Sequence, residues 1–118
     1  MIVDDEPEAV EFLREFLTAE GYEVLAASNG EDALRRVKEE RPHLILLDVH
    51  LPDVNGLEVL RQVRQIDHGV GVIMVAPVNE EETGRQALKL GAFDYITRPL
   101  DFKYLERCLW YKITTMTL

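Results

Sequence analysis

Short runs of apolar residues alternate along this chain with longer segments in which apolar residues recur every three or four positions. Continuous runs are typical of strands buried on both faces, and the spaced pattern is typical of helices with one buried side. The expected strands are residues 1–3, 22–27, 43–48, 70–76 and 93–97, and the expected helices are residues 7–20, 31–40, 56–66, 80–90 and 101 to about 113. Because strands and helices alternate with short connections, we predict an α/β domain in three layers, with a parallel sheet between two layers of helices.

The segment LILLDVHLPDVNG, residues 44–56, contains an apolar run that ends abruptly in a carboxylate, Asp48. The first predicted strand is also followed by carboxylates, Asp4 and Asp5. In an open parallel sheet, functional groups gather beyond the carboxyl ends of the strands. If the first and third strands are neighbours, these three carboxylates converge at one edge of the sheet.

Three clustered carboxylates repel one another and raise each other's pKa, and a divalent cation relieves that repulsion. Mg²⁺ suits such a cluster because it is held by one or two carboxylates together with water and phosphate oxygens. Arg98 follows the fifth predicted strand and supplies a cation at the same edge. A carboxylate beside Mg²⁺, with a cation opposite, can accept a phosphoryl group, because this reaction depends mainly on positioning and charge neutralisation.

Composition and charge exclude several classes of function. The chain has 118 residues, which suits one domain with one core, and a formal net charge of −9, which would repel the phosphates of a nucleic acid. No apolar run approaches the ~20 residues of a membrane-spanning helix, and the acidic residues 4–6 do not fit a signal peptide. The single cysteine, Cys108, excludes an internal disulfide and fits the reducing cytoplasm.

Three motifs, IVDDE, LILLDVHLPDVNG and GAFDYITRPL, together resemble the receiver domain of bacterial two-component response regulators. The resemblance covers essentially the whole chain, so residues 1–118 are expected to form one receiver domain, either stand-alone or cut from a longer response regulator. It implies a flavodoxin-like fold with five helices and a five-stranded parallel sheet in the order 2-1-3-4-5. It also implies a signalling switch rather than a metabolic enzyme, phosphorylated by a histidine kinase or a phosphotransfer protein.

The resemblance implies a role for each matching residue. Asp48 would be the phosphoacceptor, Asp5 a direct Mg²⁺ ligand, Asp4 a partner of the metal largely through water, and His50 a ligand through its backbone carbonyl. Tyr95 corresponds to the aromatic residue that moves with the switch. The phosphoryl group would bias a two-state arrangement of the fourth helix, fifth strand and fifth helix, and thereby a surface for an effector domain or a second copy of the chain.

Two positions depart from the pattern of the family. Ala76 ends the fourth predicted strand, where the family has a Thr or Ser whose hydroxyl bonds a phosphoryl oxygen. Arg98 replaces the usual Lys before Pro99, and its planar fork keeps the charge without reproducing the geometry of an ammonium group. We therefore expect phosphorylation to survive and the conformational switch to be weakened.

The sequence leaves three other functions open. A degenerate receiver would keep the fold and dock partners without phosphorylation, and Ala76 favours it. A flavin-binding electron carrier of similar architecture would need a phosphate-binding loop after the first strand, where residues 4–6 would repel a phosphate. A Mg²⁺-dependent phosphatase with an aspartate nucleophile would need a second acidic residue two positions after Asp48, where His50 stands.

Other conspicuous residues have structural explanations. Asp53 and Asp101 lie where turn or cap residues are expected, and Cys108 lies beside leucines in a helix, as a buried thiol does. Trp110 and Tyr111 are adjacent in the last helix, so they cannot both point into one core. One of the two is expected to be exposed and to mark a contact surface.

Overall fold

The structure, a computed structural model, describes residues 1–116, and the last two residues of the expected domain 1–118 lie outside the described part. Its centre is one parallel sheet of five strands in the order β2-β1-β3-β4-β5. The strands are β1 (Ile2–Val3), β2 (Ala26–Ala27), β3 (Leu44–Asp48), β4 (Gly71–Ala76) and β5 (Asp94–Thr97). The predicted strand order is thus confirmed.

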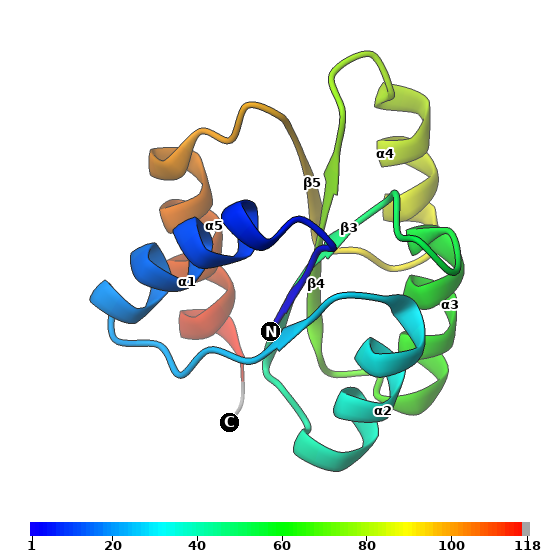
Figure 1. The fold of residues 1–118 in the computed structure, drawn as a ribbon, viewed down its shortest axis with the longest axis horizontal. Helices are drawn as coiled ribbons and strands as arrows, with labels where there is room; N and C mark the ends of the chain where they lie inside the picture. The colour runs from blue at the N-terminus through cyan, green and yellow to red at the C-terminus, as the bar shows by residue number, and fades with distance from the viewer. Residues whose placement is uncertain (117–118) are drawn as a thin grey trace.

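Helices cover both faces of this sheet, as predicted (Figure 1). They are α1 (Pro7–Ala19), α2 (Gly30–Glu40), α3 (Gly56–Ile66), α4 (Glu81–Lys89) and α5 (Phe102–Thr115). One face carries α1 and α5, and the other carries α2, α3 and α4, so the molecule has three layers (Figure 1). Within residues 1–116, no helix combines the length and apolarity needed to cross a lipid bilayer.

The central strands explain the absence of polar alternation in the sequence. In β3, Ile45 and Leu47 point into the core beneath α2 and α3, whereas Leu46 points into the core beneath α1 and α5. In β4, Met74 and Ile73 divide between the two cores in the same way. Because successive side chains of a strand point to opposite faces, a strand between two helical layers must be apolar at every position.

The second predicted strand is much shorter than the sequence indicates. Residues 22–27 were expected to be extended and paired, but only Ala26 and Ala27 pair with β1, opposite Ile2 and Val3. A strand is defined by its partner, and β1 itself is only two residues long. The apolar pattern of residues 22–25 therefore reflects burial near the sheet edge rather than a ladder of hydrogen bonds.

Aspartate side chains cap two helices at their amino ends, as predicted. Asp101 accepts hydrogen bonds from the backbone N–H groups of Lys103 and Tyr104 at the start of α5. Asp53, in the loop after β3, accepts from Gly30 and Glu31 at the start of α2, at 2.8 and 3.0 Å. Asp53 therefore ties the loop that follows Asp48 to a neighbouring helix.

Candidate functional site

The sheet register brings the predicted acidic residues together. In the pairing of β1 with β3, Val3 lies opposite Leu47, so the next residues, Asp4 and Asp48, leave the sheet side by side. One carboxylate oxygen from each of Asp4, Asp5 and Asp48 lies within 4.8 Å of the other two. The predicted convergence of three carboxylates at the carboxyl edge of the sheet is confirmed.

Asp48 is buried, with 5% of its surface exposed, and its two carboxylate oxygens have different surroundings. Oδ1 accepts a hydrogen bond from the backbone N–H of His50 at 3.3 Å and lies 3.4 Å from a guanidinium nitrogen of Arg98. Among the described residues 1–116, no group donates a hydrogen bond to Oδ2. The contacts therefore fix the carboxylate through one oxygen and leave the other available for chemistry.

The pKa of the Asp48 carboxyl is raised above its ordinary value, and burial is the largest cause. The positive charge of Arg98 lowers this pKa, and the negative charge of Asp4 raises it to a smaller extent than burial does. The sequence predicted a raised pKa from mutual repulsion of the carboxylates. Repulsion does contribute, but removal of the carboxyl from water has the larger effect.

A close approach of the backbone shapes the loop that follows Asp48. The N–H of Gly56 donates to the carbonyl of Val49 at 2.7 Å, which folds the loop back onto the end of β3. A Cβ atom at Gly56 would lie 2.2 Å from the carbonyl oxygen of Asp48, a distance that no side chain can adopt. A glycine is therefore required at this position of the motif for a steric reason.

Arg98 lies beside both buried carboxylates. Its backbone N–H donates to the carbonyl of Ala76 at 3.0 Å, which anchors it at the end of β4. From there, one guanidinium nitrogen donates to Asp4 at 2.6 Å and the other to Asp48 at 3.4 Å. The sequence predicted a cation at this edge but did not predict that its shorter contact would be with Asp4.

Ala76 lies at the predicted end of β4, opposite Thr97 of β5. It is completely buried and belongs to the core beneath α3 and α4. Its methyl group neither donates nor accepts a hydrogen bond, so at this corner of the site the side chain offers no polar ligand.

His50 is exposed, and its ring contacts a residue that the sequence did not single out. The Nε2 atom of His50 lies 2.8 Å from a carboxylate oxygen of Glu80, the residue that precedes α4. This contact joins the loop after β3 to the loop after β4, above the acidic cluster. A pairing between residues thirty positions apart has no local sequence signal, because it depends on which loops the fold brings together.

Tyr95 of β5 packs against α4. A Cβ atom at Gly84 would lie 2.3 to 2.5 Å from three atoms of the Tyr95 ring, so the ring occupies the space that a side chain at this position would take. Tyr95 is half-buried and packs against the core beneath α2, α3 and α4. The predicted switch aromatic is therefore directly coupled to α4.

The donor set of the acidic cluster suits a hard divalent cation. It consists of carboxylate oxygens, two from buried residues and one from the exposed Asp5, and the edge is open to water beside Asp5. Mg²⁺ prefers oxygen ligands and retains several waters, which this half-open arrangement can accommodate. The cluster is consistent with the magnesium site of receiver domains.

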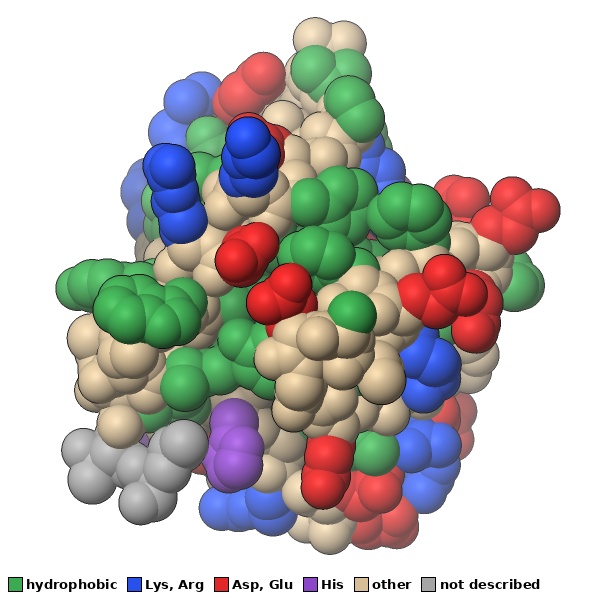
Figure 2. Space-filling view, turned by 90° about the vertical axis from the view of Figure 1, so that its left-hand side faces the viewer, with side chains coloured by type: hydrophobic (Ala, Val, Ile, Leu, Met, Phe, Trp, Pro, Cys, Tyr) green, Lys and Arg blue, Asp and Glu red, His purple; other side chains and the backbone are tan. Residues whose placement is uncertain are grey.

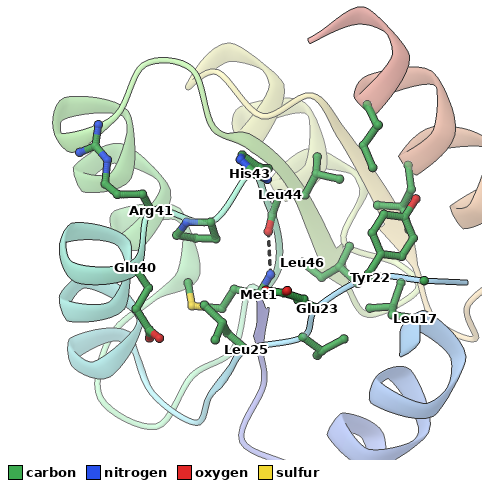
Figure 3. A pocket seen from close by; sticks show the side chains of 15 residues that line it. Met1, Leu17, Tyr22, Glu23, Leu25, Glu40, Arg41, His43, Leu44 and Leu46 are labelled. Atoms are coloured by element: carbon green, nitrogen blue, oxygen red, sulfur yellow. Dashed lines mark hydrogen bonds between the residues drawn. The ribbon is translucent and has the colours of Figure 1, made fainter. Parts of the chain in front are cut away.

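A separate cavity of about 540 Å³ lies at the opposite edge of the sheet (Figure 3). Its lining includes Tyr22, Leu25, His43 and Leu44, and the amino group of Met1 donates to the carbonyl of Leu44 at 2.7 Å. Burial lowers the pKa of that amino group to about 6. The cavity contacts none of the three clustered carboxylates, so it is not part of the acidic site.

Large hydrophobic side chains are exposed on the outer helices. Trp110 and Tyr111 are 67% and 57% exposed, so both face solvent, where the sequence predicted one. Phe12 of α1 and Tyr104 of α5 are also exposed. Figure 2 shows hydrophobic side chains gathered among charged ones on the face that carries α1 and α5. Cys108, by contrast, is buried, as predicted.

Comparison with known proteins agrees with this geometry. The response regulator receiver domain family matches residues 1–109. The alkaline phosphatase synthesis transcriptional regulatory protein PhoP of Bacillus subtilis is 42% identical over 99 residues, which is 84% of this chain and 41% of that protein. The chain thus spans less than half the length of this curated relative.

Solved structures give the same result. The receiver domain of NtrX from Brucella abortus superposes with a TM-score of 0.91 at 27% identity, covering 97% of each chain. A CheX-CheY-BeF3-Mg²⁺ complex from Borrelia burgdorferi matches with a TM-score of 0.88 at 28% identity, covering 95% of this chain and 86% of that one. An acidic pocket at the carboxyl edge of a sheet in this order is typical of the phosphoacceptor sites of such domains.

Proposed function

Because this chain belongs to the response regulator receiver domain family, we propose that it is the phosphoacceptor module of a two-component phosphorelay, with Asp48 as the residue that is phosphorylated. The observation that carries the proposal is the convergence of Asp4, Asp5 and Asp48 beside Arg98. A receiver domain is a signalling module rather than a classical enzyme, and the only chemistry proposed here is transfer to and loss from its own side chain.

In the proposed reaction, the free Oδ2 atom of Asp48 attacks the phosphorus of a phosphohistidine on the donor protein. A phosphorus–oxygen bond forms, the phosphorus–nitrogen bond breaks, and the leaving imidazole takes up a proton. Mg²⁺ bound by Asp4, Asp5, Asp48 and the backbone carbonyl of His50 would neutralise charge on the phosphoryl oxygens. Arg98 would bind those oxygens from the opposite side, and the backbone N–H of His50 holds the attacking carboxylate in place.

Oriented contacts to Asp48 support this role more strongly than its acidity does. A buried carboxyl with a raised pKa must still be ionised to attack, and Arg98 favours the ionised form. The hydrogen bonds to Oδ1 restrict rotation of the carboxylate, so Oδ2 is presented to an incoming phosphorus atom in one orientation. This is preorganisation of the kind that phosphoryl transfer requires.

The proposed partners follow from this reaction. The donor would be a histidine kinase or a phosphotransfer protein, and the output surface would consist of α4, β5 and α5. Exposed apolar residues on that surface include Leu88 of α4 and Tyr104 and Tyr111 of α5. We propose that this surface contacts an effector domain or a second copy of the chain, and that the protein acts in the cytoplasm as one receiver domain over residues 1–118.

A second function, docking without phosphorylation, is favoured by Ala76. Without a hydroxyl at this position, a phosphoryl group at Asp48 would lack one of its ligands and would couple less strongly to β4 and α4. A degenerate receiver would present the same partner surface whether or not Asp48 was modified. The two functions differ in whether Asp48 reacts at all.

Acetyl phosphate distinguishes these functions, with intact mass as the measurement. With Mg²⁺, the proposed phosphoacceptor gains the mass of one phosphoryl group, and with a chelator in place of Mg²⁺ it gains none. A protein whose mass is unchanged in the presence of Mg²⁺ would be a docking module instead.

A further inference from the structure

The guanidinium group of Arg98 connects the two buried carboxylates of the acidic site. Its contacts with Asp4 and Asp48 come from two different nitrogens, at 2.6 and 3.4 Å. Asp4 is only 3% exposed, so this contact lies away from solvent screening on the carboxylate side. A lysine ammonium has a single nitrogen and cannot reproduce two contacts that are separated in this way.

This contact leaves Asp4 with both oxygens occupied before any metal binds. Oδ2 accepts from Arg98, and Oδ1 accepts from the backbone N–H of Glu6 at 3.0 Å. A metal in the acidic cluster, or a water bound to it, would need a lone pair of Asp4. The metal would also place two positive charges close to the guanidinium group, which would repel each other.

We propose that Arg98 is an internal competitor of Mg²⁺ for Asp4. In the unphosphorylated protein its guanidinium group supplies part of the neutralising charge that the metal would supply, so Mg²⁺ binds weakly. This inference rests on the proposed function, since it takes the acidic cluster to be the metal site.

The competition makes the metal and the phosphoryl group bind cooperatively. A phosphoryl group on Asp48 attracts Arg98 away from Asp4, because it offers a higher negative charge and several acceptor oxygens. Asp4 is then free for the metal. By linkage, the factor by which the Arg98–Asp4 contact weakens Mg²⁺ binding equals the factor by which Mg²⁺ weakens that contact.

Titration of the unphosphorylated protein with Mg²⁺ tests the competition, with the backbone amide NMR signals of Asp4, Asp5 and Asp48 as the measurement. The Arg98→Lys variant keeps the charge and loses the second donor nitrogen. We expect it to bind Mg²⁺ about tenfold more tightly than the natural protein, since one charge-assisted hydrogen bond corresponds to roughly that factor. Arg35→Lys is a matched control, because Arg35 also contacts two carboxylates, on the exposed face of α2, and should leave Mg²⁺ affinity unchanged.

A second measurement needs no variant. The Nε–H signal of Arg98 in the natural protein should shift on addition of Mg²⁺ with the same midpoint as the amides of the acidic residues. Equal Mg²⁺ affinity in the natural and Arg98→Lys proteins, or an Arg98 signal that ignores Mg²⁺, would overturn the competition and leave the proposed phosphoacceptor function standing. A lack of any response to Mg²⁺ at Asp4, Asp5 and Asp48 in both proteins would overturn the competition together with the proposed metal site.

Discussion

Ala76 is the single residue that most limits the strength of the proposed switch. It is fully buried at the end of β4, one position beyond the residue that pairs with Asp48. A hydroxyl here could bond a phosphoryl oxygen and transmit the change to the loop before α4. A methyl group cannot, so the phosphorylated and unphosphorylated states differ by one fewer contact.

Replacement of Ala76 by Thr should therefore enlarge the conformational response. A hydrogen bond to a charged group contributes roughly 1.5–3 kcal/mol, which is comparable with the gap between two states of a switch. The measurement is the change in NMR shifts of Tyr95 and α4 when beryllium fluoride and Mg²⁺ are added as a phosphoryl mimic. Ala76→Val matches Thr in shape without the hydroxyl and should not enlarge the response.

Individual site residues differed in how far the sequence could predict them. Asp4, Asp5 and Asp48 could be located because each follows an apolar run, and parallel strands end at one edge. The contact of Arg98 with Asp4 could not be predicted, because a long side chain with two carboxylates in reach selects between them by distances of about an ångström. The pair of His50 and Glu80 depends on the relative positions of two loops, which the pattern of either loop does not contain.

At the scale of elements, the contact between α4 and β5 links the acidic site to the proposed partner surface. Tyr95 of β5 lies against Gly84 of α4, and the absence of a Cβ atom at Gly84 creates the space for the ring. The position of the ring and the position of the helix therefore depend on each other.

Gly84→Ala should displace the Tyr95 ring. The added methyl group would lie 2.3 Å from the ring, and relief of such overlap costs about 1–3 kcal/mol, partly offset by the better helix propensity of Ala, about 1 kcal/mol. We expect a lower midpoint of urea unfolding and NMR signals of Tyr95 shifted toward those of a solvent-exposed ring. Gly69→Ala is the control, because its nearest neighbour would be at an ordinary 3.5 Å. Unchanged Tyr95 signals in Gly84→Ala would show that the contact does not couple β5 to α4.

The cap that Asp53 provides for α2 makes the stability of the domain depend on pH. Hydrogen bonds from the N–H groups of Gly30 and then Glu31 lower the pKa of Asp53. A carboxyl whose pKa is lower in the folded protein stabilises the fold above its unfolded pKa, about 3.9, and this contribution is lost as the pH falls through the folded pKa. The natural protein should thus be more stable than Asp53→Asn at pH 5–8, and the difference should shrink below about pH 4. Thermal melts across this range measure it, and a difference that stays constant down to pH 2 would exclude the cap as its source.

Elements as a whole were predicted well wherever packing and pattern agreed. The buried strands β3 and β4 and the amphipathic helices lie within a residue or two of their expected positions, because each buries its apolar side against the sheet or the helices. The segment 22–27 was wrong in its first four residues. Whether an apolar segment becomes a strand depends on a partner distant in the sequence, and a local pattern does not report the length of that partner.

For the whole molecule, metal binding and folding should be linked. The clustered carboxylates exist only in the folded chain, so Mg²⁺ binds the native state and stabilises it by mass action. At about tenfold above the dissociation constant, the stabilisation is about 1.4 kcal/mol, which raises the melting temperature of a domain of this size by several degrees.

Thermal melts with and without millimolar Mg²⁺ test this linkage. NaCl at the same ionic strength is the necessary control, because a chain with a net charge of −9 is also stabilised by general screening. We expect Mg²⁺ to raise the melting temperature beyond NaCl, and Asp48→Asn to remove most of that excess. An identical effect of the two salts would indicate that the acidic cluster does not bind the metal.

The most direct test of the central claim is the intact mass of three proteins after treatment with acetyl phosphate and Mg²⁺. The natural protein and Asp53→Asn should each gain one phosphoryl group, since Asp53 lies in the same loop but is engaged in capping α2. Asp48→Asn should gain none, because the only buried carboxylate with a free oxygen opposite Arg98 is gone from the described residues 1–116. Phosphoryl mass that persists in Asp48→Asn, or that disappears in Asp53→Asn alone, would contradict Asp48 as the phosphoacceptor.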